Sequence, residues 1–236
     1  MNASKNWRSQ LKYWHKLARE PGLTVLVIVE AVLIFLVIPL TGMGVLPDLV
    51  LPAMFVVLLL AILAVTWHSR VATIAVLIAV ILSPVGTFFW REDPTPLTVW
   101  LSAGGRFLAI ATVSLVIAGV VFGSGRVTFH RVQGAVVLYL NFGLMFFIIY
   151  RLLDTLLPNA FSGLPPLGKD FGSGAALLYF SFSTLTTLGY GDILPVHPLA
   201  RNIANLEAII GQLYPATLLA RLVSLEIMHR RESRRD

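Results

Sequence analysis

Six apolar runs, each roughly 20 residues long, constrain this chain more than any other feature of its sequence. A helix of about 20 residues spans the roughly 30 Å hydrocarbon core of a bilayer. The runs are residues 23–41, 49–67, 71–89, 104–122, 134–157 and 199–227. A further apolar run, residues 175–186, is too short to cross and suits a re-entrant half-helix. The predicted fold is therefore an all-α membrane protein.

The composition supports a membrane protein and argues against several classes of function. Of the 236 residues, 57% are hydrophobic and 13% are charged, whereas a soluble domain carries about a quarter charged residues. The chain has no cysteine, so disulfides and thiolate metal sites are excluded. The apolar runs contain no metal-ligand cluster, no nucleophile with a base and no phosphate loop. We therefore expect neither an enzyme nor an organic cofactor.

The charged residues predict the orientation of the chain. If the N-terminus is cytoplasmic, most cations fall in the inner connections, and the outer connections hold only Arg91 and Lys169. This is the positive-inside bias of membrane proteins. Both termini are then cytoplasmic, in a multi-pass protein of the cell (inner) membrane. The net charge of +6 lies in these flanks, so it indicates topology rather than binding to nucleic acid.

Four parts follow from this plan. Residues 1–22 are basic, with apolar residues at helical spacing, which predicts an amphipathic helix in the headgroup region at the cytoplasmic face. Residues 23–125 form a four-helix transmembrane domain, and residues 134–227 form a second unit that contains the short apolar run. The basic end, residues 228–236, is either a solvated tail or a contact with anionic membrane lipids.

Residues 187–192, Thr-Leu-Gly-Tyr-Gly-Asp, follow the short apolar run directly. Gly189 and Gly191 can adopt backbone angles that a side chain forbids, so several successive carbonyls can point the same way. Such oxygens, with the Thr187 hydroxyl at the inner end, can replace the water around a dehydrated cation. Leu188 and Tyr190 would then point away from the ion. Gly-Tyr-Gly alone is a common turn composition, and the membrane setting makes the pattern specific.

This motif, within residues 134–227, resembles the selectivity filter of potassium channels. The resemblance implies six transmembrane helices, with a re-entrant pore helix and a filter loop between the fifth and sixth. It also implies a homotetramer, because one chain supplies one wall of the pore. The expected function is passive, selective conduction of K+, bound at Thr187, Leu188, Gly189 and Tyr190. A weakly selective cation channel and a non-conducting, channel-like membrane protein on the same scaffold remain open as alternatives.

The residues around the motif depart from the family pattern. Tyr179 and Phe180 stand where many bacterial potassium channels have two tryptophans, and Ser183 stands where some have a glutamate that pairs with the aspartate after the filter. Asp192 is therefore expected to bind backbone or water at the outer mouth. Thr184 is a further candidate for support of the filter. The pore helix is expected to direct unpaired C-terminal carbonyls toward a central cavity, which would favour a cation there.

The last apolar run contains Gly211 and, one turn later, Pro215. Proline removes a helical hydrogen bond, so a kink is expected, which serves either as a gating hinge or as a static bend. Glu207 lies in the same run, and a carboxyl group inside a membrane is a functional candidate. It either faces the cavity and concentrates cations or braces the pore helix through Ser181 or Thr184.

We expect weak or no intrinsic voltage dependence. Steep gating needs several charges per subunit, since one charge moved through 100 mV contributes about 2.3 kcal/mol. Residues 104–122 contain a single arginine, Arg106. Conductance–voltage curves of the protein in planar bilayers measure this property, and a steep curve would contradict the prediction.

Overall fold

The computed structural model describes residues 23–47, 50–66, 69–92, 95–123, 128–165 and 170–232. Two predicted segments, the amphipathic helix of residues 1–22 and the end of the basic tail at residues 233–236, lie outside this part of the chain. Within it, a helix is present at every apolar run that the sequence indicates, including the short one.

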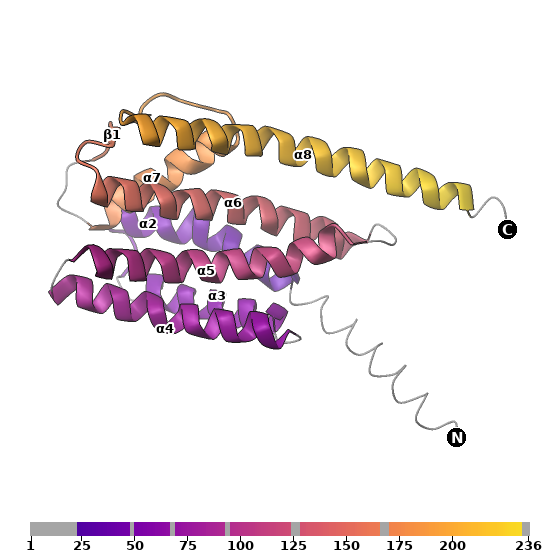
Figure 1. Ribbon diagram of the computed structural model, residues 1–236, viewed down its shortest axis with the longest axis horizontal. Coiled ribbons are helices and arrows are strands. Elements are labelled where there is room, and N and C mark those ends of the chain that lie inside the picture. The colour runs from indigo at the N-terminus through magenta and orange to yellow at the C-terminus, as the bar shows by residue number, and fades with distance from the viewer. Residues whose placement is uncertain are drawn as a thin grey trace, which may run out of the picture.

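Most of the described chain is helical, as predicted (Figure 1). The first helix, Leu23–Gly42, contains a π-helical turn, η1 (Leu33–Val37), and ends in α2 (Ile38–Gly42). The other helices are α3 (Val50–Thr66), α4 (Arg70–Glu92), α5 (Pro96–Val121), α6 (Phe129–Leu156), α7 (Asp170–Leu185) and α8 (Pro198–Glu232). In the described chain, four helices are long and apolar enough to cross a membrane: the first helix, α5, α6 and α8. This is the architecture of an all-α, multi-pass membrane protein.

Two helix ends differ from the predicted spans. α5 begins at Pro96 rather than at residue 104, because Thr95 caps it: the Thr98 N–H donates to Thr95 Oγ1 at 3.4 Å, and proline occupies the first helical position. α8 continues beyond residue 227 to Glu232. Residues 228–232, Met-His-Arg-Arg-Glu, include neither proline nor glycine, so their sequence contains no residue that would stop the helix.

The first helix packs against the second half of the chain. At its start, Thr24 Oγ1 donates to Gln133 Oε1 of α6 at 3.1 Å. In its π-helical turn, the Phe35 ring lies edge-on to the Phe182 ring of α7, with centroids 5.5 Å apart. Phe182 also lies against Gly143 of α6, where a Cβ would be 2.6 Å from the ring. The first helix is therefore joined to both α6 and α7.

α4, α5, α6 and α8 run side by side along the long axis, and α7 lies between α6 and α8 at one end (Figure 1). Gly134 lets α6 approach α5 closely, since a Cβ there would be 3.0 Å from Val121 and 3.2 Å from Ile117. One apolar cluster joins the first helix to α3, α4, α5 and α6. A second cluster, rich in aromatic rings, surrounds α7. The short helix is thus held by a core of its own.

A two-stranded ribbon holds the chain that leaves the predicted filter. β1 (Phe161–Ser162) pairs antiparallel with β2 (Leu194–Pro195). Gly163 follows with a φ of 83°, and a Cβ there would lie 1.9 Å from the carbonyl oxygen of Asp192. Glycine therefore permits both the backbone angle and the close approach. The end of the filter loop is fixed to the connection that follows α6.

α7 and α8 cross at Gly211. A Cβ at Gly211 would be 1.8 Å from the carbonyl oxygen of Leu185, the last residue of α7, so the two backbones touch. The same oxygen accepts a hydrogen bond from the Tyr139 hydroxyl of α6 at 3.2 Å. Gly211 therefore has a packing role that the hinge hypothesis does not include. The hinge stays a prediction, and α8 runs through Pro215 without a break.

Gly211→Ala is expected to lower the thermal stability of the purified protein, because the added methyl group must push α8 away from α7. Overpacking of this kind costs about 1–3 kcal/mol. Gly119→Ala in α5 is the matched control, since no atom lies within 4 Å of a Cβ there and alanine favours a helix. Melting temperatures in detergent compare the two variants, and equal values would contradict the contact at Gly211.

Candidate functional site

α7 ends in a Schellman motif, and the predicted filter begins at its left-handed residue. The Leu188 N–H donates to Ser183 O and the Thr187 N–H donates to Thr184 O, both at 2.9 Å. Thr187 has a φ of 59°, which is the left-handed conformation of this motif. Glycine usually occupies the position, and a residue with a Cβ costs about 1–2 kcal/mol there. The sequence does not predict this angle at a threonine.

The prediction of unpaired carbonyls at the end of α7 is wrong. The last four carbonyl groups of the helix all accept hydrogen bonds: three from backbone N–H groups of residues 186–189, and the fourth, Leu185 O, from the Tyr139 hydroxyl. The chain turns back over the helix end and uses these oxygens itself. Any effect of α7 on a cation therefore comes from the helix dipole as a whole and not from free carbonyl oxygens.

The backbone of residues 187–191 has positive φ at every second residue: 59° at Thr187, 56° at Gly189 and 80° at Gly191. The angles of the two glycines are those that the motif predicts. Alternating signs of φ turn successive peptide groups the same way along the chain. Within the described residues, no hydrogen bond ends on the carbonyl oxygens of Thr187, Leu188, Gly189 or Tyr190. The loop therefore holds a row of acceptors that the single chain does not use.

Gln212 of α8 reaches the start of this loop. Its Nε2 donates to Thr187 Oγ1 at 3.4 Å, and both residues are exposed in the single chain. The contact places an amide beside the Thr187 hydroxyl at the start of the loop. The two residues are 25 positions apart, and the apolar pattern of α8 does not indicate which of its faces is turned toward the loop.

Asp192 accepts a hydrogen bond from a side chain, a partner that the sequence does not predict. The Tyr179 hydroxyl donates to Asp192 Oδ1 at 3.2 Å. The Tyr179 ring also stacks on the Tyr190 ring, with centroids 6.1 Å apart and an interplanar angle of 13°. Tyr179 thus connects α7 to the loop by both its ring and its hydroxyl.

The other predicted support residues act through the body of α7. Phe180 is buried, and its ring lies 5.0 Å from that of Tyr150 on α6 and 5.4 Å from that of Phe161 on β1. Ser183 and Thr184 contribute the backbone carbonyls of the Schellman motif. These residues hold α7 in place, whereas Tyr179 contacts the loop itself.

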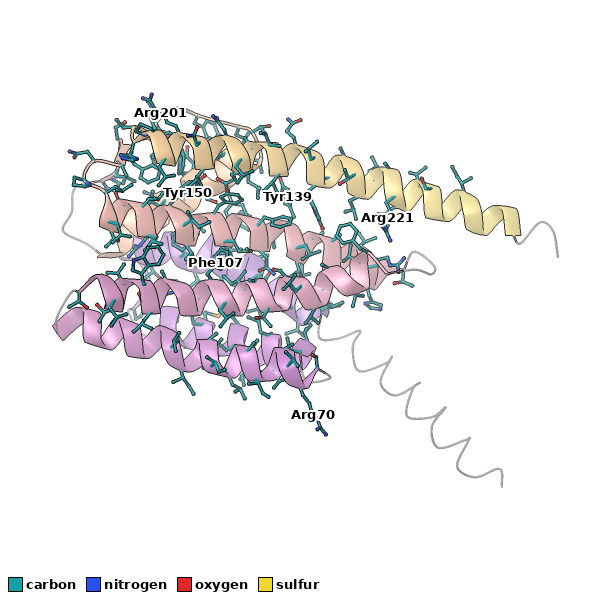
Figure 2. All side chains as sticks on the ribbon, viewed as in Figure 1. Arg70, Phe107, Tyr139, Tyr150, Arg201 and Arg221 are labelled. Carbon is teal, nitrogen blue, oxygen red and sulfur yellow. The ribbon has the colours of Figure 1, made fainter. Side chains whose placement is uncertain are left out.

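Glu207 of α8 is fully buried between α6 and α7. Its Oε1 lies 2.5 Å from Ser181 Oγ of α7, and its Oε2 lies 2.5 Å from the Tyr150 hydroxyl of α6. Ser181 Oγ is also 2.8 Å from the carbonyl oxygen of Gly143. Figure 2 shows Tyr139 and Tyr150 in the space between α6 and α8. Of the two orientations that the sequence leaves open, the structure has the one in which Glu207 braces α7 through Ser181.

The other end of α8 is bonded to α5. Arg221 Nη2 donates to Phe122 O and, at 3.5 Å, to Gly123 O, and its guanidinium carbon lies 5.4 Å from the centroid of the Phe122 ring (Figure 2). Arg131 of α6 donates to the same Gly123 oxygen at 2.8 Å. Two cations therefore meet the C-terminal end of α5, which is the negative pole of its dipole.

Comparison with known proteins points to ion channels for the second half of the chain. Residues 134–226 match a family model described as an ion channel. A segment of 42 residues is 43% identical to the inward rectifier potassium channel Kirbac3.1 of Paramagnetospirillum magnetotacticum. That segment covers 18% of this chain and 14% of the relative. No solved structure matches the chain. The chain is thus similar to ion channels in the region that contains α6, α7, the loop and most of α8.

Tyr179→Phe is expected to loosen the loop, because it removes the hydroxyl that Asp192 accepts from. The pair is exposed and water competes for both partners, so we expect a modest effect, with exchange faster by roughly twofold. Hydrogen–deuterium exchange of peptides that cover residues 186–193 measures this. Thr155→Val is the control, since that hydroxyl is exposed and bonds only to its own helix at Arg151 O. Unchanged exchange in Tyr179→Phe would contradict the contact.

Proposed function

We propose that the protein is a potassium-selective channel that conducts K+ passively through a homotetrameric pore. The loop of residues 187–191 carries this proposal, since it has positive φ at every second residue and a row of carbonyl oxygens with no described donor. Potassium channels use such oxygens in place of the hydration shell of the ion. The carbonyls of Thr187, Leu188, Gly189 and Tyr190 bind K+ in turn, and the Thr187 hydroxyl adds a ligand at the inner end.

The exposure of the loop supports assembly with three further copies. Leu188 is 61% exposed and Tyr190 is 67% exposed in the single chain. Exposed apolar residues continue along α8 at Leu206, Ile209 and Leu213. Lipid can cover such side chains, but it cannot satisfy the carbonyls of the loop, so a loop at membrane depth must line a water-filled path or be covered by protein. Four loops around one axis place those carbonyls on a path for cations.

In this assembly α8 lines the inner cavity. Gln212, beside Thr187, presents its amide just inside the filter, where a hydrated cation would meet it. The contact of Gly211 with Leu185 fixes that part of α8 to the pore helix. We therefore place the gating bend at Pro215, which lies one turn farther along and lacks the N–H of a regular helix.

The arrangement of charge supports a membrane topology with six spans and both termini in the cytoplasm. Figure 2 shows Arg70 and Arg221 at one end of the molecule and Arg201 at the other, near the loop. Arg70 and Arg221 follow the positive-inside bias if the end of the molecule where they lie is cytoplasmic. The loop then enters from the outer face of the cell membrane. The basic residues after α8 would lie beside anionic headgroups of the inner leaflet.

A weakly selective cation channel is the second candidate. The exposed bond between Tyr179 and Asp192 favours it, because the hydrogen bond that supports the loop competes with water in the single chain. A less rigid filter discriminates less well between K+ and Na+. Reversal potentials in mixed potassium and sodium solutions separate the two candidates.

Gly189→Ala is expected to reduce K+ uptake into liposomes at least about tenfold, because alanine at this φ costs about 1–2 kcal/mol in each of four subunits and reorients a carbonyl of the filter. Gly44→Ala is the matched control. Gly44 has a similar φ of 73°, and, as at Gly189, no atom lies within 4 Å of a Cβ. Uptake through the wild-type protein that is no greater than that of empty liposomes, or a wild-type protein that stays strictly monomeric in lipid, would contradict the proposed function.

A further inference from the structure

We infer that Glu207 is a neutral carboxylic acid whose own proton completes the contact that holds α7 between α6 and α8. The proton follows from the geometry of the buried oxygens alone. Its consequence for conduction rests on the proposed channel function. Glu207 touches no part of the loop of residues 187–191 in the described bonds, so it is a positioning residue.

The number of hydrogens available for hydrogen bonds at this site requires a proton on Glu207. Three oxygen–oxygen contacts meet there: Tyr150 to Glu207 at 2.5 Å, Ser181 to Glu207 at 2.5 Å, and Ser181 to Gly143 O at 2.8 Å. The two hydroxyl groups supply one hydrogen each. An ionised carboxylate and a backbone carbonyl only accept, so an ionised Glu207 would leave one of the three contacts without a hydrogen.

A protonated Glu207 satisfies every contact in one arrangement. Its Oε1–H donates to Ser181 Oγ, the Ser181 hydroxyl donates to Gly143 O, and the Tyr150 hydroxyl donates to Glu207 Oε2. The chain of bonds then runs from α6 through α8 to α7 and back to α6. Buried polar groups are stabilising only when they are satisfied in this way.

The groups around Glu207 contain no charge that would balance an ionised carboxylate. α6 presents the hydroxyls of Tyr150 and, farther away, Tyr139, and α7 presents Ser181. In the described part of the chain, Glu207 forms no ion pair with an arginine or lysine. An isolated charge buried among apolar residues is costly, and a carboxyl group avoids that cost by keeping its proton.

The contact acts on the filter through α7. Ser181 lies one turn before Leu185, where α7 ends and the loop begins. If Glu207 is ionised, or if its side chain is too short to reach Ser181, this side of the pore helix is no longer held at Ser181. We therefore expect K+ selectivity to depend on a group that donates one hydrogen and accepts another at position 207, and not on negative charge.

Three variants separate hydrogen bonding from charge. Glu207→Gln keeps the length of the side chain, one donor toward Ser181 and one acceptor toward Tyr150. Glu207→Asp keeps the carboxyl group but is one methylene shorter and does not reach both partners. Glu207→Leu removes both bonds. We expect the ratio of K+ to Na+ permeability of Glu207→Gln to stay within about twofold of wild type. We expect the ratio of the other two variants to fall about tenfold, since leaving a buried hydroxyl without a partner changes an equilibrium by roughly a factor of ten.

Infrared difference spectroscopy of the full-length protein in lipid reports the proton directly. The spectrum of wild type minus Glu207→Gln is expected to contain the carbonyl stretch of a protonated carboxylic acid. Glu30 is the other buried carboxyl group in the described chain, and its Oε2 has no hydrogen-bond partner there. A protonated Glu30 would give a similar band, which the Glu30→Gln variant identifies. The Glu207 band should persist in Glu30→Gln and should shift in Tyr150→Phe, which removes the donor to Oε2.

The permeability ratios and the infrared spectra can contradict the inference independently of each other. A carboxylate band at Glu207, or selectivity retained by Glu207→Asp and lost by Glu207→Gln, would overturn the inference. If wild-type protein transports no cation, the proposed channel function fails, while the infrared band still decides whether the proton is present. A protonated band together with retained selectivity in Glu207→Gln and loss in Glu207→Asp supports both.

Discussion

The placement of α7 is the physical constraint on which this structure depends. A helix of 16 residues is too short to cross a bilayer, and the loop that follows it exposes backbone carbonyls that lipid cannot satisfy. Such an element is stable in a membrane only if protein surrounds it. Three neighbours do so here: α8 touches the end of α7 at Gly211, α6 receives Phe182 at Gly143, and the first helix covers Phe182 with Phe35.

The contacts around α7 use two kinds of interaction. Glycines allow backbones to approach where a side chain would collide, as at Gly211 and Gly163. Buried polar groups then set the position more narrowly, because each bond at Glu207 and at the Leu185 carbonyl has a direction as well as a distance. Thr187 takes a strained angle at the end of this helix, and the Schellman bonds compensate for the strain.

Much of this fold can be predicted from the sequence, because apolar length decides which segments are helices and the two glycines decide the form of the loop. Helix ends are harder, and the cap at Thr95 moves the start of α5 to Pro96. The partners across helices are hardest. Glu207 meets Tyr150, and Gln212 meets Thr187, only because α6 and α8 have one rotation about their axes. Polar and apolar residues are only weakly separated onto opposite faces of α6 and α8, so the sequence does not indicate that rotation.

The bonds between Arg221 and the end of α5 have a mechanical consequence for the molecule. The C-terminal half of α8 can move sideways only if α5 moves with it or if the Arg221 guanidinium leaves the carbonyls of Phe122 and Gly123, which then bind water instead. Gly134 in turn fits α6 closely against α5. A force that displaces α5 therefore acts on α8 through contacts within the same chain.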